Sequence, residues 1–316
     1  MTQPRTFDHS ITGQNVLVTG GAGFIGSHIA DALVADNTVH VLDDLSAGTR
    51  EHIPEGAELV IGDITDESLL SEMMVDADIV FHEAAVVSVE RSVEAPLETN
   101  DVNIGATLRL FECARRTDTR VVIASSAAIY GDPEYVPVDE THRTTASSPY
   151  GVTKLATDQY ARIYESLYGL PTVSLRYFNA YGPRQRGGAY SGVISTFVEQ
   201  ATAGDPITIN GDGTQTRDFV HVDDIVQANL QAATTSHVGE AINVGTGETV
   251  TIRELAELIR DETGSTSSIV HTDPRPGDVE HSCADITKAK DRLGFEPSVP
   301  LSSGLKTVPG MQRNLQ

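Results

Sequence analysis

Thr19-Gly20-Gly21-Ala22-Gly23-Phe24-Ile25-Gly26 decides the fold, because it follows an apolar run, NVLVT at 15–19, and opens a helical pattern. Glycines at 20, 23 and 26 of such a strand-to-helix turn let backbone N–H groups and the helix N-terminus approach a pyrophosphate. The stretch therefore predicts a dinucleotide cradle. The residues expected to contact the cofactor there are Gly20, Gly23, Phe24, Ile25 and Gly26.

Two acidic residues at the ends of the next predicted strands extend this cofactor site. Asp43 stands 23 residues after Gly20, close to the offset of roughly 20 residues at which an acid binds an adenosine ribose. Its carboxylate would repel the 2′-phosphate of NADP, so we expect NAD. Asp63 and the adjacent Ile64 are expected at the adenine. The alternative is that these glycines and acids only form turns.

Short β-branched runs alternate with amphipathic stretches from about residue 15 to 180, which is typical of a parallel sheet with crossover helices. The strands are expected at 15–19, 38–42, 57–61, 78–82, 120–125 and 172–176. The helices are expected near 24–35, 67–74, 97–116, 149–168, 192–203, 223–233 and 251–262. We predict an α/β fold, a Rossmann-type doubly wound parallel sheet with a smaller C-terminal substrate-binding region. Residues 1–178, with a returning segment at about 220–246, would form the NAD-binding domain, and 179–316 mainly the smaller region.

Tyr150 and Lys154 stand at i and i+4 near the start of the helix expected at 149–168, so they project from one face. A lysine ammonium beside a phenol lowers a pKa that starts at about 10, which suits a general base. The bare Tyr-x-x-x-Lys pattern is common on surface helices. Here Ser126 follows the strand expected at 120–125 and supplies a hydroxyl at the sheet edge where ligands bind. We therefore predict Ser126, Tyr150 and Lys154 as catalytic residues, with Tyr150 and Lys154 also contacting the cofactor.

These residues resemble the extended short-chain dehydrogenase/reductase family, specifically its NAD-dependent nucleotide-sugar 4-epimerase branch, which acts on UDP-glucose or UDP-N-acetylglucosamine. The likeness spans nearly the whole chain. Beyond the residues above it includes LRYFNAYGPRQ at 175–185, GDG at 211–213, RDFVHVDD at 217–224 and RPGD at 275–278.

The resemblance implies further site residues. Tyr177 is expected beside the nicotinamide and Asn179 at the substrate diphosphate. Arg217 and Arg275 would clamp that diphosphate, for which the planar guanidinium fork is suited, and Asp278 would bind the uridine ribose. The alternative for each arginine is a surface ion pair with one of the many acids.

The resemblance also implies a mechanism, in which Tyr150 takes the proton of the sugar 4-OH while hydride passes from C4 to NAD, and both return to the opposite face. Related dehydratases carry an acidic pair directly after the serine or threonine, where this chain has Ala127 and Ala128. Decarboxylases of UDP-glucuronate often carry an acid at the second of these positions, where this chain has Ala128. Reductases of nucleotide-linked keto sugars usually prefer NADP, which Asp43 argues against. We expect a UDP-sugar 4-epimerase, with a UDP-glucuronate 4-epimerase or decarboxylase, or another dehydratase or reductase, as alternatives.

The range of sugars that the enzyme accepts is expected to depend on Ser282. Glucose-restricted epimerases resemble one another in placing a bulky tyrosine against the sugar C2 group at the corresponding position. A serine leaves room for an N-acetyl group, and HSCADITKA at 281–289 resembles the branch that accepts N-acetylhexosamines. We expect interconversion of UDP-GlcNAc with UDP-GalNAc, alongside UDP-glucose with UDP-galactose. The alternative is that Ser282 points elsewhere and loops select the sugar.

The charge of the chain excludes several classes of protein. Its 45 acidic and 22 basic residues give a net charge of -23, which argues against a nucleic-acid-binding face. This acidity and the scarcity of lysine suggest a halophilic origin, since molar salt screens the repulsion; an ordinary acidic mesophilic protein is the alternative. Without a signal-peptide pattern or a run of 18 apolar residues, we expect a cytoplasmic protein with no membrane anchor. Two distant cysteines and no ligand spacing predict no metal site.

Members of the family that this chain resembles dimerise by packing two helices, which correspond here to about 97–116 and 149–168, so the resemblance implies a homodimer. Both stretches carry apolar stripes; the alternative is that these stripes face only the sheet. The stripe residues are Leu108, Phe111, Cys113, Ala114, Ala156, Tyr160, Ile163 and Leu167. A non-catalytic NAD-sensing protein on the same fold is the alternative from another class, and the retained Ser126, Tyr150 and Lys154 argue against it.

Overall fold

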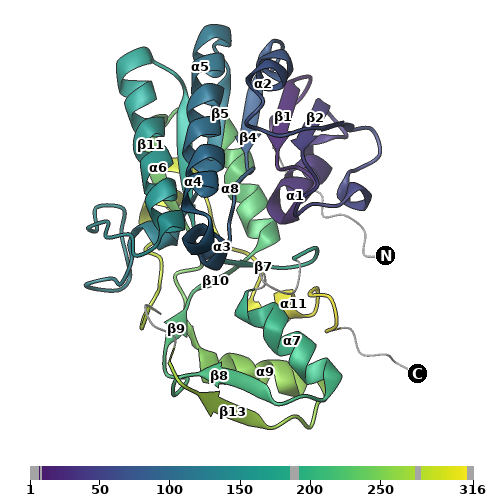
Figure 1. Cartoon of the computed structure of the whole chain (residues 1–316), viewed down its shortest axis with the longest axis vertical. Helices are drawn as coiled ribbons and strands as arrows, with labels where there is room; N and C mark the ends of the chain where they lie inside the picture. The colour runs from purple at the N-terminus through teal and green to yellow at the C-terminus, as the bar shows by residue number, and fades with distance from the viewer. Residues whose placement is uncertain (1–6, 8, 186–191, 275–278, 312–316) are drawn as a thin grey trace.

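A seven-stranded parallel sheet in the order β11-β6-β5-β4-β1-β2-β3 forms the core of the computed structural model, which describes residues 7, 9–185, 192–274 and 279–311 (Figure 1). The strands are β1 (Asn15–Thr19), β2 (Thr38–Asp43), β3 (Glu58–Ile61), β4 (Ile79–His82), β5 (Arg120–Ser126), β6 (Thr172–Tyr177) and β11 (Glu240–Val244). The doubly wound fold expected from the sequence is thus confirmed. The edge strand β11 was missing from the expected strands.

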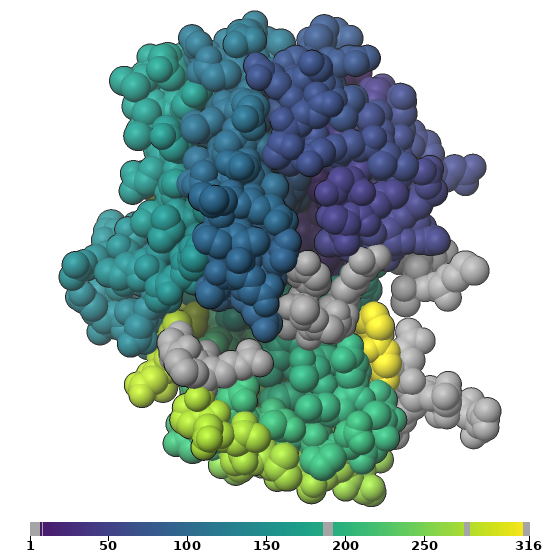
Figure 2. Space-filling view, viewed as in Figure 1, coloured from purple at the N-terminus to yellow at the C-terminus, as the bar shows by residue number. Residues whose placement is uncertain are grey.

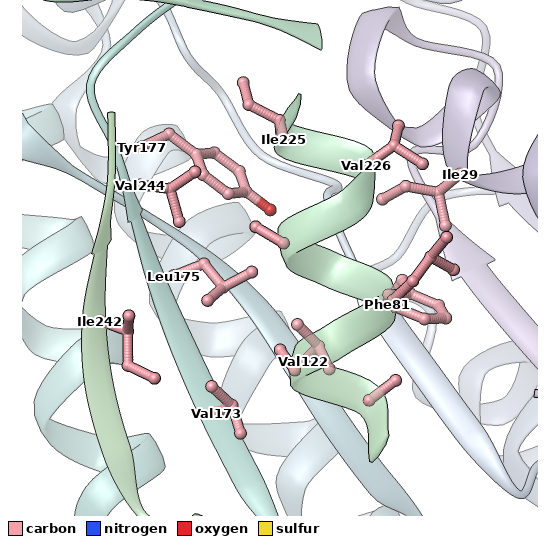
Figure 3. Close-up of a cluster of buried hydrophobic side chains, with 14 of the residues drawn as sticks. Ile29, Phe81, Val122, Val173, Leu175, Tyr177, Ile225, Val226, Ile242 and Val244 are labelled. Atoms are coloured by element: carbon pink, nitrogen blue, oxygen red, sulfur yellow. The ribbon is translucent and has the colours of Figure 1, made fainter. Parts of the chain in front are cut away.

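Helices cover both faces of this sheet, because alternate residues of each strand point to opposite faces. On one face, α1 (Phe24–Leu33) and α8 (Val222–Thr234) pack through residues such as Ile29, Ile225 and Val226. Figure 3 shows α8 crossing the side chains of β5, β6 and β11, with Ile225 near Tyr177 and Val226 beside Ile29 of α1. On the other face lie α2 (Glu67–Met74), α5 (Thr107–Thr117) and α6 (Pro149–Tyr168).

The crossover between β4 and β5 departs from the single helix expected near 97–116. It consists of α3 (Val89–Glu94), α4 (Pro96–Asn100), a π-helical stretch at Asp101–Ala106 and then α5. Such π turns widen a helix locally. Here Asn103 on the widened turn is buried and bonds Thr153 of α6, with 2.9 Å between Nδ2 and Oγ1. The irregular turn therefore joins this crossover to the helix that bears Tyr150 and Lys154.

The smaller region lies beyond the carboxyl ends of the strands (Figures 1 and 2). It has its own apolar cluster between α7 (Val193–Ala203), α9 (Ile252–Thr263) and the parallel pair β8 (Ile207–Asn210) and β13 (Ile269–Thr272). The remaining elements are β7 (Asn179–Tyr181), β9 (Thr216–Arg217), β10 (Phe219–His221), β12 (Val250–Thr251), α10 (Thr287–Leu293), α11 (Leu301–Leu305) and the single turns at Arg50–His52 and Ala127–Ile129. Within the described ranges, no helix combines the length and apolar character needed to cross a membrane.

Candidate active site

The glycine turn after β1 is packed backbone against backbone. Gly20 has φ of +68°, and a Cβ built there would lie 2.7 Å from the backbone nitrogen of Ala84. A Cβ at Gly26 would collide with the carbonyl oxygen of Gly20. α1 starts at Phe24 with Gly23 as its N-cap, and no side chain caps its first N–H groups. This arrangement leaves the positive end of the helix available to an anion.

Asp43 lies against this turn at the end of β2. Its two carboxylate oxygens accept hydrogen bonds from the backbone N–H groups of Ala22, at 2.9 Å, and Leu45, at 2.8 Å. An acidic acceptor beside an uncapped helix start fits an adenosine ribose next to a pyrophosphate, so the residues present fit NAD. Asp63 is exposed at the end of the neighbouring β3 and accepts from the Thr65 N–H at 2.8 Å, while Ile64 is buried.

Ser126, Tyr150 and Lys154 come together where β5 meets the start of α6. Ser148 caps α6 by accepting from the Gly151 N–H, and Pro149 occupies the first turn, a sequence pattern typical of a helix start. The Lys154 ammonium donates to the Ala124 carbonyl oxygen at 2.7 Å. The Ser126 side chain forms a hydrogen bond with the Tyr150 side chain. One end of the sheet therefore carries a phenol, an ammonium and a hydroxyl in adjoining positions.

Burial shifts the pKa values of both Tyr150 and Lys154. Burial raises the pKa of Tyr150, while the hydrogen bond with Ser126 acts to lower it. Burial also lowers the pKa of Lys154 to about 8, because the charged ammonium loses its hydration. Near neutral pH, the lysine thus keeps the proton and positive charge that a phenolate on Tyr150 needs.

Glu83 is a member of this pocket that the sequence analysis missed. It directly follows β4, and its Oε1 accepts from the Tyr177 hydroxyl at 2.8 Å. The same hydroxyl accepts from Asn229 Nδ2 of α8, also at 2.8 Å. Burial raises the pKa of Glu83 to about 7. The signal was an acid placed directly after an expected strand, at the edge where Ser126 was identified.

Of the residues expected to bind the substrate, Asn179 lies on β7 and Arg217 on β9, whereas Ser282 lies in a connecting segment. Asn179 on β7 donates from Nδ2 to the Asp218 carbonyl oxygen at 2.9 Å. Arg217 on β9 is partly exposed, and the Ser282 N–H donates to the carbonyl oxygen of neighbouring Thr216 at 3.1 Å. Arg217 and Ser282 are therefore brought together, whereas Arg275 and Asp278 lie outside the described residues.

Asp218, which the sequence analysis did not single out, joins the segments around this region. It is fully buried, and its carboxylate accepts from the Thr246 N–H and hydroxyl, the Gly247 N–H and the Ala284 N–H at 2.6 to 3.0 Å. Four donors on one carboxylate satisfy nearly all its acceptor sites. Its place within RDFVHVDD, beside Arg217, was the available signal.

Comparisons with known proteins agree with this geometry. Residues 16–245 match the sequence model of the family described as "NAD dependent epimerase/dehydratase family". A putative UDP-glucose 4-epimerase of Methanocaldococcus jannaschii is 41% identical over 95% of this chain and 98% of its own length. The structure of a UDP-N-acetylglucosamine 4-epimerase of Methanobrevibacter ruminantium M1, in complex with UDP-N-acetylmuramic acid, superposes with a TM-score of 0.91 at 38% identity, covering 94% of this chain and 97% of that one. A UDP-glucose 4-epimerase of Thermotoga maritima, solved with UDP-glucose, gives a TM-score of 0.90 at 40% identity, covering 93% and 96%.

Proposed function

Because the chain belongs to the NAD-dependent epimerase/dehydratase family, we propose that its pocket inverts C4 of a UDP-hexose, with UDP-GlcNAc/UDP-GalNAc and UDP-glucose/UDP-galactose as substrate pairs. One observation carries the proposal: the Ser126 hydroxyl, the Tyr150 phenol and the Lys154 ammonium meet at the sheet edge that also bears the glycine turn. Two full-length relatives of about 40% identity, named a putative UDP-glucose 4-epimerase and a UDP-glucose 4-epimerase, support the reaction type.

Each residue of the proposed mechanism acts through an atom described above. NAD, when bound, would accept a hydride from C4 of the sugar and later return it, so that no net redox change would occur. Tyr150 Oη removes the proton from the 4-OH and returns it after the sugar has presented its other face. Ser126 holds the reacting oxygen beside that phenol, and the Lys154 charge favours the phenolate.

The turn after Ser126 argues for epimerisation against elimination. Ala127 and Ala128 form the single turn at Ala127–Ile129 and offer no acid or base. A dehydratase needs such groups to remove the C5 proton and protonate the leaving hydroxyl. UDP-glucuronate 4-epimerisation or decarboxylation stays an alternative, since a chemically similar sugar reaches the same phenol.

We assign the substrate contacts as the sequence indicates: Asn179, Arg217 and Arg275 to the diphosphate, Asp278 to the uridine ribose, and Ser282 to the sugar C2 group. We assign the cofactor contacts to the glycine turn with Phe24 and Ile25, to Asp43, Asp63, Ile64 and Tyr177, and to the catalytic pair. Residues 1–178 with about 220–246 form the proposed NAD-binding domain, and 179–316 mainly the substrate-binding region.

The proposed homodimer uses a surface narrower than the two stripes that the sequence indicated. Phe111, Cys113 and Ala114 of α5 are buried in the core and unavailable to a partner, and Leu108 of the same stripe is partly buried. On α6, however, Tyr160, Ile163 and Leu167 are exposed, with Leu167 at 67%, and the adjoining α4 exposes Leu97 at 81%. Apolar exposure of this kind is typical of a protein interface. We also propose a cytoplasmic location, in keeping with two free thiols.

The proposed function is tested with protein purified in molar KCl and incubated separately with UDP-GlcNAc, UDP-glucose and UDP-glucuronate. Proton NMR should show new axial 4-OH sugar signals without accumulation of NADH. Tyr150→Phe should lower turnover by about 100-fold or more while NAD and UDP still bind. Loss of the carboxyl carbon, a 4-keto-6-deoxy product, or no reaction would replace the proposal with a decarboxylase, a dehydratase or a binding protein.

A further inference from the structure

The end of the motif LRYFNAYGPRQ at 175–185 lies against the cofactor helix α1, and the proposed function gives its last three residues no task. Asp31 of α1 forms an ion pair with Arg184, with 2.6 Å between Oδ2 and Nη2. One turn earlier on α1, His28 Nε2 donates to the Pro183 carbonyl oxygen at 3.1 Å. Two neighbouring contacts thus join the helix that begins at the glycine turn to the chain that leaves β7.

Both contacts are partly shielded from solvent. The side chains of Arg184 and Asp31 are 28% and 22% exposed, so their attraction is stronger than that of a pair in open water. Burial lowers the pKa of His28 and outweighs the carboxylates of Asp31 and of Asp223 on α8, which act to raise it. The imidazole is therefore neutral at neutral pH, and the charged contact at this place is the pair of Arg184 with Asp31.

The backbone of Arg184 is unusual for its residue type. It has φ of +67°, in the left-handed region that glycine and asparagine occupy with less strain. A larger residue persists in this region where its surroundings compensate the backbone cost, and such strain points to a function. The ion pair with Asp31 is a contact that compensates the cost here.

A short loop connects Arg184 to Asn179, the proposed contact of the diphosphate. Across this loop, Gln185 Nε2 donates to the Ala180 carbonyl oxygen at 3.0 Å. Asn179 Nδ2 donates to the Asp218 carbonyl oxygen at 2.9 Å. The loop is therefore held by Asp218 at one end and by α1 at the other. A shift of Arg184 would reach the neighbour of Asn179 through the bond between Gln185 and Ala180.

We propose that Arg184 and Asp31 are positioning residues, whose ion pair holds the loop at 179–185 against the cofactor helix and thereby sets the place of the UDP diphosphate relative to NAD. This inference rests on the proposed function for the identity of the ligand. Neither side chain is assigned to a reacting atom. Arg184 acts through the loop that carries Asn179, and Asp31 acts through Arg184.

Arg184→Asn separates positioning from stability, because asparagine tolerates a left-handed backbone but is too short to replace the arginine at Asp31. The Kd of UDP, measured by calorimetry with NAD in excess, should rise by about 5-fold, which corresponds to one lost hydrogen bond from Asn179 to the diphosphate. The Tm should stay the same or rise, since the backbone strain is relieved. A purely structural role predicts the reverse, a lower Tm with unchanged affinity of the folded protein for UDP.

An exchange of the two charges tests the ion pair itself. Asp31→Arg and Arg184→Asp should each weaken UDP binding, and the double variant should recover most of the affinity because opposite charges face each other again. Aspartate, like asparagine, tolerates the left-handed backbone. Glu240→Ala is the matched control. Glu240 on the edge strand β11 pairs with Lys288 at 2.8 Å and with a similar exposure, 26% and 30%, so its loss should leave the Kd of UDP unchanged.

Two results would overturn the proposal: unchanged UDP affinity in Arg184→Asn, or a double variant that binds UDP no more tightly than the single variants. Both are measured without turnover, so they do not depend on which sugar is the substrate. A wild-type protein that bound no UDP would instead contradict the proposed function, and this inference would fail with it.

Discussion

Arg176 and Asp158 form a two-pronged ion pair beneath the catalytic helix: Nε and Nη2 of Arg176 each lie 2.9 Å from a different carboxylate oxygen of Asp158. Asp158 stands one turn after Lys154 on α6, and Arg176 lies on β6. Both side chains are buried. Because Asp158 belongs to α6 and Arg176 to β6, the ion pair holds this part of α6, and Lys154 with it, against the sheet.

Asp158→Asn should destabilise the fold by about 3 to 5 kcal/mol, because it leaves the Arg176 charge buried without its partner. Urea unfolding measures this, with Glu98→Gln as the control. Glu98 pairs with Arg91 at a similar 2.8 Å but on the surface, so its loss should cost less than about 1 kcal/mol. Similar losses for the two variants would contradict the role of the buried pair.

The stability that this ion pair contributes should disappear only in acid. Burial acts to raise the pKa of Asp158, but the hydrogen bonds and charge of Arg176 outweigh it and hold the pKa below its usual range. A lowered folded-state pKa means that the contribution is present above the unfolded-state pKa, about 3.9, and lost as pH falls through the folded value. The gap in unfolding free energy between wild type and Asp158→Asn should therefore stay level from neutral pH to about pH 5 and close only below it.

Gly26→Ala should weaken NAD binding by at least about 10-fold, because the new Cβ would meet the Gly20 carbonyl oxygen and push α1 away from the turn. Calorimetric titration with NAD measures the change. Gly105→Ala is the matched control, since its nearest neighbour would be Arg109 Nη1 at an ordinary 3.5 Å. Unchanged NAD affinity in Gly26→Ala would argue against the glycine turn as the cofactor cradle.

Ser282→Tyr should lower kcat/KM for UDP-GlcNAc by about 100-fold and leave UDP-glucose close to wild type, because the ring would fill the space given to the N-acetyl group. Ser282→Ala keeps a small side chain and should retain both activities. Epimerisation of the two sugars is followed side by side by proton NMR. Comparable turnover of both pairs by Ser282→Tyr would refute the gatekeeper role.

Molar KCl should raise the Tm of the protein. A net charge of -23 creates self-repulsion, and raising salt from about 0.1 M to about 1 M shortens the screening length from about 10 to about 3 Å. Differential scanning calorimetry across this range measures the effect, with an uncharged osmolyte at equal osmolarity as the control. A Tm unchanged by KCl would dispose of the halophilic interpretation.

Local sequence patterns predicted the central sheet well, because buried parallel strands are short β-branched runs punctuated by glycine turns. The six expected strands agree with β1 to β6 within one residue at either end, and the helices at 67–74 and 149–168 have the expected bounds. β11 was missed because EAINV is a single short run in the stretch after residue 180 where the alternation of strands and helices loosens, although the segment at about 220–246 was expected to return to this domain. Its place beside β6 is set by long-range pairing that no local pattern contains.

The candidate site was predictable where chemistry follows a motif and not where it depends on distant partners. The structure brings Ser126, Tyr150 and Lys154 together as the motifs indicated. Glu83 and Asp158 gain their importance from partners on β6, at Tyr177 and Arg176. Sequence separation hides such pairs, because their meeting depends on the order of strands in the finished sheet.

The hydrogen bonds of Asp218 have a mechanical consequence. Its backbone oxygen accepts from Asn179, and its carboxylate accepts from Thr246, Gly247 and Ala284. These are the stretches by which the chain passes between the sheet and the smaller region, so this one residue bonds to all three connectors. Hydrogen bonds shared among the connectors resist a hinge-like opening between the two regions. A ligand bound between the sheet and the smaller region would then rotate through its own torsions, without a movement of the two regions around it.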